Sequence, residues 1–245
     1  MGEVYRLDLS KEDLKSLPEF VLRLNNLQEL NLSENQLSEL KGIGRLKNLQ
    51  ILNIGVNRFT AFPDEINSLH HLKVLDIYWN DIKSFPENFY TNNNIEELDL
   101  TSMFKFDFAS GLAKIHRLKK LRTLNLGNNQ IPMLTINFSE LKNLQELGYI
   151  RQDSVNVSSL LQNLSTCKRL KVLHLSVNHI KQLPPEIALL DSLQELNLFQ
   201  NQVSTLPNEL IRLKQLKEIT LIDNPVDTEA ISKVEKQLPS TNIIY

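Results

Sequence analysis

One phrase, L-x-x-L-x-L-x-x-N, recurs along this 245-residue chain and constrains its fold more than any other feature. Clear copies begin at residues 27, 49, 72, 121, 170, 193 and 216, and degenerate copies begin at residues 4, 95 and 144. The fourth positions of these ten copies follow one another at intervals of 22 to 26 residues, most often 23. Self-similarity at such a period predicts a repeat architecture, in which each copy builds one coil and stacks on its neighbours.

The alternating Leu and Ile residues of each copy predict a short β-strand, with its apolar side chains facing inward and the residues between them facing outward. We expect the strands of successive coils to pair in parallel. The Asn that ends the phrase can donate and accept through its amide, so a buried copy can satisfy backbone groups of adjacent coils. We therefore predict a structural ladder, rather than a ligand site, at Asn35, Asn57, Asn80, Asn129, Asn178, Asn201 and Asn224. Met103 and Gln152 take this position in two degenerate copies.

Prolines open the segments that return the chain from one strand to the next. Pro18, Pro63, Pro86, Pro184 and Pro207 each follow Leu or Phe and precede a polar-apolar stretch such as "PDEINSLHHL". Proline is tolerated in the first turn of a helix, so each stretch predicts a short helix or 3₁₀ segment. The copies that continue as "TSMFKFDFASGLAKIHRLKKL" and "IRQDSVNVSSLLQNLSTCKRL" lack the proline and are three residues longer. They predict a longer helix, or alternatively a specialised contact loop.

With these motifs the sequence resembles the leucine-rich repeat proteins over nearly its whole length. The returning "FPDEINSLHHL", "LPPEIALLDSL" and "LPNELIRLKQL" are similar to the 23-residue subclass of Ras-pathway scaffolds, Scribble-type polarity proteins and many bacterial proteins. The resemblance implies an α/β solenoid of about ten repeats. Its parallel sheet would line a concave face, and short helices, 3₁₀ segments and loops would form the convex face.

The two ends of the chain differ in how they are closed. We assign residues 1–226 to the solenoid, and residues 227–245 to a capping helix and tail of the same domain. In "DTEAISKVEKQL", Asp227 is the expected N-cap, and Ala230, Ile231, Val234 and Leu238 share one face. This ending resembles the C-terminal cap of bacterial members. Those members carry a helical cap and often an export signal upstream, so we expect a longer natural chain, with Met1 and Gly2 foreign to it.

Composition narrows the function classes. A net charge of −2 and a pI near 6.2 do not favour nucleic acid as a partner. No apolar run reaches the roughly 20 residues that a membrane span needs. The single Cys167 rules out a multi-thiolate zinc site and reads as a structural thiol, and the five histidines lack metal-ligand spacing. No nucleophile recurs beside His174, so we expect no enzyme activity, no metal and no cofactor.

The variable positions 3, 5, 7 and 8 of each copy should project from the concave sheet or its edge. They carry ten acidic and three basic side chains, about −7 in sum, and the rest of the chain then carries about +5. The basic side chains lie in return segments such as "RLKNL" and "RLKQL". An acidic concave face favours a partner with basic groups over phosphate-backbone binding. The alternative is that these carboxylates only keep an exposed sheet soluble.

An apolar cluster stands out on this acidic face. The predicted protein-binding residues are Ile51, Val56, Val74, Tyr78 and Trp79, with Asp76, Glu97 and Asp99 beside them and Phe199 in a weaker second group with Val172 and Val177. Trp and Tyr are enriched among binding hot spots, and exposed apolar patches mark interaction sites. The alternative for Trp79 is that its ring only packs over the neighbouring coil.

These expectations define a non-catalytic, monomeric module that binds a protein partner on its concave face. The alternative is a bacterial surface or secreted adhesin, or a glycan-binding protein. The compartment follows from the same choice: secreted or cell surface if an export signal has been removed, and otherwise cytoplasmic.

Overall fold

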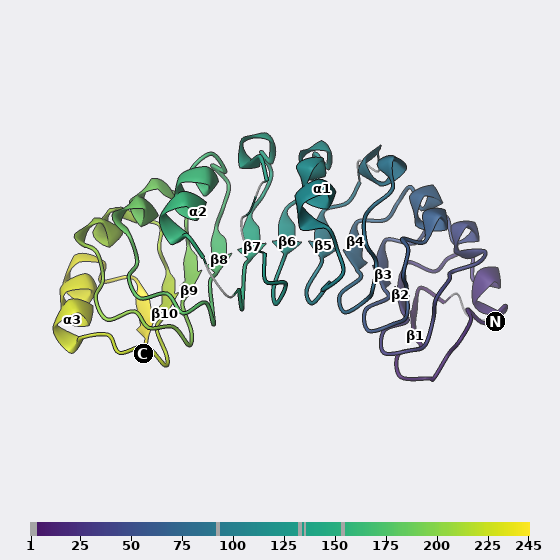
Figure 1. Ribbon diagram of the computed structural model, residues 1–245, viewed down its shortest axis with the longest axis horizontal. Coiled ribbons are helices and arrows are strands. Elements are labelled where there is room, and N and C mark those ends of the chain that lie inside the picture. The colour runs from purple at the N-terminus through teal and green to yellow at the C-terminus, as the bar shows by residue number, and fades with distance from the viewer. Residues whose placement is uncertain (1–3, 92–93, 132–133, 135, 153–154) are drawn as a thin grey trace. The chain divides into compact units, whose positions relative to one another are not determined.

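The computed structural model describes residues 4–91, 94–131, 134, 136–152 and 155–245. The expectation about Met1 and Gly2 lies outside these residues. The contacts within the chain divide it into two compact units, unit 1 up to Leu124 and unit 2 from Asn125 onward. Figure 1 labels the α-helices and all but the last of the strands of the two units.

Each repeat copy contributes one three-residue strand, at positions 3 to 5 of the phrase. In unit 1 the strands are β1 (Arg6–Asp8), β2 (Glu29–Asn31), β3 (Ile51–Asn53), β4 (Val74–Asp76) and β5 (Glu97–Asp99). Strand β6 (Thr123–Asn125) spans the unit boundary. In unit 2 the strands are β7 (Glu146–Gly148), β8 (Val172–His174), β9 (Glu195–Asn197), β10 (Glu218–Thr220) and β11 (Asn242–Ile244). Within each unit, strands that are consecutive in sequence pair in parallel, which confirms the predicted parallel sheet.

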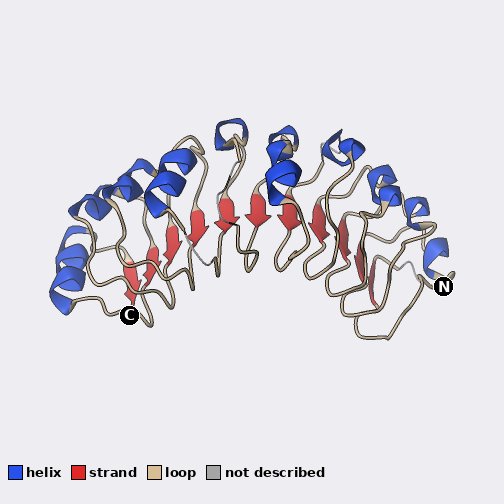
Figure 2. Cartoon of the chain, in the orientation of Figure 1, coloured by secondary structure: helices blue, strands red, loops and turns tan. Residues whose placement is uncertain are grey.

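Helical segments return the chain between strands. In each unit they run along the side of the coils opposite the strands (Figure 2), and we call these the helical side and the strand side. The 3₁₀ segments are Val21–Arg23, Ile43–Arg45, Asp64–Ser68, Glu87–Thr91, Ile115–Arg117, Phe138–Glu140, Pro185–Leu189 and Asn208–Arg212. The α-helices are α1 (Phe108–Ala113), α2 (Val157–Leu164) and α3 (Thr228–Gln237).

The two longer copies form helices, as one of their two interpretations predicted. Their extra residues build α1 and α2 where the other copies have 3₁₀ turns. Each helix begins at a side chain that caps its free amides. Asp107 accepts from the backbone N–H groups of Ala109 and Ser110, and Asn156 accepts from that of Ser159.

An aromatic cluster reinforces the core of unit 1. The rings of Phe85 and Phe89 stack with their centroids 4.0 Å apart, and Phe62 packs edge-on against both. Phe106, from the next coil, packs edge-on against Phe85 at 4.9 Å. All four side chains are buried. Such pairs add to the free energy gained by burial alone, so the coils that carry β3 to β5 rest on a rigid core.

The C-terminal end is closed by a helix and a strand. Asp227 caps α3 by accepting from the N–H of Glu229 at 3.0 Å, and Ile231, Val234 and Leu238 are buried, as predicted. The tail beyond the helix was not predicted to form structure. It forms β11, which pairs in parallel with β10 and so covers the last strand of the repeat array.

Position 8 of the phrase has left-handed backbone geometry in all ten copies, although none of them is a glycine. Their φ angles lie between 50° and 61°. This conformation costs about 1–2 kcal/mol per residue for a side chain with a Cβ. It is held by hydrogen bonds between coils, since the N–H of Val56 donates to the carbonyl of Tyr78, and that of Trp79 to the carbonyl of Thr101. The turn thus fixes where the position 8 side chain points.

Candidate protein-binding surface

Three adjacent strands of unit 1 bring most of the predicted binding residues together. Eight of the nine lie on β3, β4, β5 and the turns that follow: Ile51, Val56, Val74, Asp76, Tyr78, Trp79, Glu97 and Asp99. The ninth, Phe199, belongs to unit 2. The register of the sheet forms two rows on the strand side of unit 1. One row aligns Ile51, Val74 and Glu97, and the other aligns Asn53, Asp76 and Asp99.

Tyr78 packs over the preceding coil. A Cβ added to Gly55 would lie only 2.1 Å from Cε1 of the Tyr78 ring, so the absent side chain of Gly55 makes room for that ring. Tyr78 is consequently half-buried. The packing over a neighbouring coil that was considered for Trp79 is therefore found for Tyr78.

Trp79 points outward and meets an aromatic ring of the following coil. Its side chain is 56% exposed and contacts Phe104, itself 58% exposed, with the ring centroids 6.1 Å apart and the ring planes at 80°. Phe104 was not among the predicted binding residues. We call Tyr78, Trp79 and Phe104 the aromatic ridge. Two large rings in mutual contact that still expose more than half of their surface form an apolar patch of the kind that marks binding sites.

A group of carboxylates lies beside the ridge. Burial, and after it the negative charges of Asp99 and Glu97, together raise the pKa of Asp76 to about 6. Asn53, the residue of β3 that is aligned with Asp76, carries no charge, and neither does Ile51, which is aligned with Val74. At two other places on the strand side a carboxylate lies near a basic side chain: Arg6 pairs with Glu29 at 3.0 Å, and His174 lies 3.4 Å from Glu146.

Not all of the variable positions project outward as predicted. Position 7 is buried at Ser33, Gly55, Gly127 and Ser176, and Ser102 at position 8 is buried as well. At the two serines of position 7 a hydrogen bond to the strand row holds the side chain down: the hydroxyl of Ser33 donates to Oδ1 of Asn31, and that of Ser176 to Oδ1 of Asn197. Tyr78, in contrast, is half-buried and reaches the surface.

The asparagines that end the phrase join neighbouring coils by hydrogen bonds. Nδ2 of Asn80 donates to the carbonyls of Ile54 and Ile77 at 2.9 and 3.1 Å, and its Oδ1 accepts from the N–H of Phe59 at 3.1 Å. Gln152 replaces the asparagine in its copy and accepts from the N–H of Ile131. The other asparagines that end the phrase also form side-chain hydrogen bonds with backbone groups, at Asn35, Asn57, Asn129, Asn178, Asn201 and Asn224.

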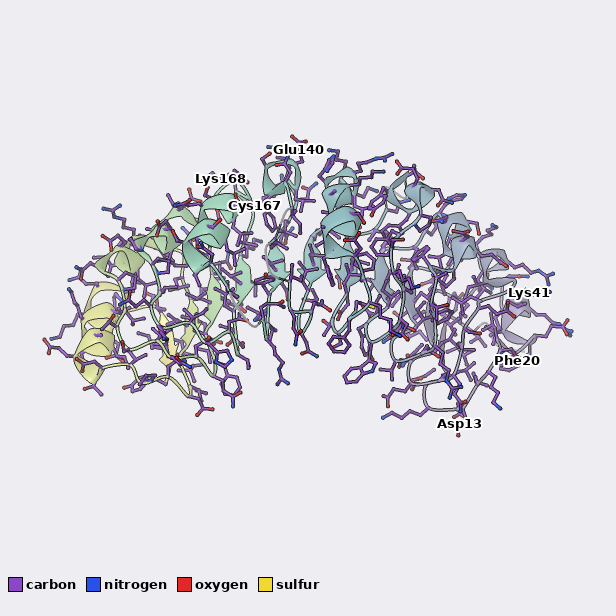
Figure 3. The ribbon with its side chains drawn as sticks, in the orientation of Figure 1. Asp13, Phe20, Lys41, Glu140, Cys167 and Lys168 are labelled. Carbon is purple, nitrogen blue, oxygen red and sulfur yellow. The ribbon has the colours of Figure 1, made fainter. Side chains whose placement is uncertain are left out.

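Groups suited to metal binding are not assembled in the described parts of the chain. No cluster of three His, Cys, Asp or Glu side chains there could hold a metal ion. Cys167 is buried on the helical side of unit 2, near Lys168 (Figure 3), and its Sγ donates to the carbonyl of Phe138. Burial raises the pKa of this thiol to about 11. None of the described helices is long and apolar enough to cross a membrane.

Each coil has a parallel strand and a helical return, and seven of the ten copies have an asparagine turn. These features define a class of protein, the repeat solenoid with one strand per repeat. Comparison with family descriptions then identifies the family. A leucine-rich repeat region matches residues 31–167, and a leucine rich repeat matches residues 168–226. The chain belongs to the leucine-rich repeat family, and the fold is the leucine-rich repeat solenoid that the sequence predicted.

Solved structures share this fold. An internalin (InlF) from Listeria monocytogenes is 21% identical, with a TM-score of 0.54 over 98% of this chain and 80% of that one. The plant peptide hormone receptor RGFR1, in complex with RGF2, is 25% identical, with a TM-score of 0.59 over 94% of this chain and 37% of the receptor. A TDR receptor is 25% identical, with a TM-score of 0.64 over 99% of this chain and 47% of the receptor. A search of curated proteins found no match.

Proposed function

We propose that the protein is a non-catalytic interaction module that binds a protein partner on the strand side of unit 1. The observation that carries this proposal is the exposed contact between Trp79 and Phe104. The repeat does not require these rings, since at the position of Trp79 other copies carry Lys, Glu, Ser, Asn, Arg, Val, Gln or Asp. Large aromatic side chains that are free of a structural role are the commonest anchors of protein interfaces.

The carboxylates favour a partner with basic groups. Asp76, Glu97 and Asp99 lie beside the ridge, and a cationic surface would meet them with complementary charge. The same charges oppose a nucleic-acid backbone. We expect a monomer, which leaves the aromatic ridge free for such a partner. Light scattering in solution measures this oligomeric state.

The family supports the proposal at a coarser level. Leucine-rich repeat folds generally serve as interaction scaffolds, and the receptor RGFR1 was solved with RGF2 bound. A fold does not assign a partner, so the argument for this chain depends on its own side chains.

The test compares a ridge variant with a matched control. In the variant, Tyr78→Ser and Trp79→Asn introduce residue types that other copies carry at those positions, as at Ser33 and Asn128. The control is Phe20→Ala, which removes an aromatic side chain that is 53% exposed before the first 3₁₀ segment of unit 1 (Figure 3).

Proteins captured by the purified wild type are identified, and their affinities are measured by calorimetry. Loss of a hot-spot aromatic costs at least about 2 kcal/mol, so the ridge variant should bind about 30-fold more weakly while the control is unchanged. Equal affinity for both variants would refute the site. Ridge-dependent capture of a glycan instead of a protein would favour the adhesin alternative.

A further inference from the structure

The ridge and its surroundings say more about the partner than that it is basic. We propose that the aromatic ridge is the docking surface for an arginine-bearing segment of the partner. Its guanidinium would lie against Asp76 and Asp99, and a neighbouring apolar side chain would pack on Trp79 and Phe104. This inference rests on the proposed function and adds the chemistry that the surface recognises.

The ridge supplies the apolar part of this recognition. Trp79 is held outward by its left-handed backbone (φ 53°), and the N–H of Trp79 is bonded to the carbonyl of Thr101 in the next coil. Phe104 supports one edge of the Trp79 ring without covering it, since both remain more than half exposed. The rings are therefore positioned in advance, which lowers the entropy lost when an apolar side chain binds on them.

The two aspartates supply the polar part. Asp76 and Asp99 are aligned on neighbouring parallel strands. Such strands are about 4.8 Å apart, so one guanidinium can span the two carboxylates. The charged groups that face Asp76 are Asp99 and Glu97 of β5, while β3 presents Ile51 and Asn53.

These like charges select a cation as the occupant. Burial and the neighbouring carboxylates raise the pKa of Asp76 to about 6, so its ionised form is disfavoured in the free protein. A bound cation would offset this repulsion and stabilise the ionised carboxylates of Asp76 and Asp99. The occupant that fits is thus a cationic segment with an apolar neighbour, not an acidic one.

Arginine fits this surface better than lysine for three reasons. Its planar guanidinium has five donors in a fixed geometry, so it can donate to both carboxylates at once. It is more weakly hydrated than an ammonium group, which matters beside the half-buried Asp76. It also stacks on aromatic faces, and Tyr78 and Trp79 lie two and three residues after Asp76 in the chain.

The chain carries its own reporter for a test, because Trp79 is its single tryptophan. The probe is a blocked Ala-Leu-Arg-Leu-Ala peptide, titrated while the fluorescence of Trp79 is followed. Matched peptides carry lysine, or the neutral isostere citrulline, in place of arginine. At pH 7.5 the arginine peptide should bind about tenfold more tightly than the citrulline peptide, with lysine between them, because charge-assisted hydrogen bonds are lost.

Two variants assign the effect to the carboxylates. In the double variant Asp76→Asn and Asp99→Asn, the arginine peptide should bind only as tightly as the citrulline peptide. Asp8→Asn, at the equivalent position of β1, should leave the preference intact. The preference for arginine should also fall as the pH is lowered through 6, because Asp76 then takes up a proton. Circular dichroism checks that each variant folds.

Equal affinity of the arginine and citrulline peptides would overturn the inference, and so would the absence of a saturable fluorescence change with the arginine peptide. A preference that persists in the double aspartate variant would overturn it as well. These outcomes leave the proposed function to its own test, since a captured protein could still depend on Tyr78 and Trp79.

Discussion

Replacing Asn80 by alanine tests how much one asparagine of the ladder stabilises the solenoid. The side chain is 4% exposed, so water cannot replace the bonds it makes. The N–H of Phe59 and the carbonyl of Ile77 each lose a hydrogen bond to it. The carbonyls of Ile54 and Tyr78 also lose one bond each, but they keep the bonds from Nδ2 of Asn57 and from the N–H of Val56.

The expected loss of stability is worked out from the N–H of Phe59 and the carbonyl of Ile77. A buried polar group without a hydrogen bond costs about 1–3 kcal/mol, so Asn80→Ala should lower the free energy of unfolding by about 3 kcal/mol. That is a large part of the total for a typical domain, about 5–15 kcal/mol. Asn53→Ala is the matched control, because Asn53 is half-buried and accepts one bond, from the N–H of Gly55. It should cost about 1 kcal/mol or less.

Urea unfolding followed by far-ultraviolet circular dichroism measures both losses. A loss for Asn80→Ala below about 1 kcal/mol, or no larger than that for Asn53→Ala, would refute this role of the ladder. It would mean that backbone pairing between strands holds the coils together without the amides.

Three further predictions use other features of the structure. Gly55→Ala should displace the Tyr78 ring, since the new Cβ would lie 2.1 Å from it, and should lower the free energy of unfolding by about 1–3 kcal/mol. In a double-mutant cycle, the same substitution in a Tyr78→Ala background should cause no such loss. Folding raises the pKa of Asp76 from 3.8 to about 6, so the folded state binds more protons between these values and stability falls as the pH rises through them. Asp76→Asn should therefore add about 3 kcal/mol at pH 7.5 and little at pH 3.5, as compared by urea unfolding. In the native protein Cys167 should resist alkylation at pH 8, because burial raises its pKa to about 11. Mass spectrometry should show full alkylation in urea, and fast alkylation of the native protein would contradict the burial of this thiol.

The repeat phrase predicts the fold closely because each of its positions has a physical function. Alternating leucines can bury only one face of an extended chain, and the structure has β1 to β10 at positions 3 to 5 of the phrase. The three extra residues of two copies likewise mark where α1 and α2 form, whereas the other copies form 3₁₀ segments with the return-segment proline or, at Ile43–Arg45 and Phe138–Glu140, without it. These features depend on residues close together in the chain, and such patterns can be read without the tertiary structure.

Features that depend on contacts between coils were not predicted. Position 8 adopts left-handed geometry without glycine, because bonds between coils outweigh the local preference. Phe104 lies outside the nine-residue phrase, so its contact with Trp79 could not be read from the alignment of copies. Gly55 leaves room for the Tyr78 ring, but this role can be recognised only once β3 is known to pair with β4.

The central claim is that the aromatic ridge serves binding and not folding, and Trp79→Asn tests it most directly. Asn occupies the same position, with the same left-handed geometry, in another copy, at Asn128. The measurement is the affinity for a captured partner, with the free energy of unfolding determined on the same samples. The account predicts unchanged stability and binding weakened about 30-fold. Unchanged binding, or a loss of stability above about 2 kcal/mol, would contradict it, since a ring that holds the coil together belongs to the fold.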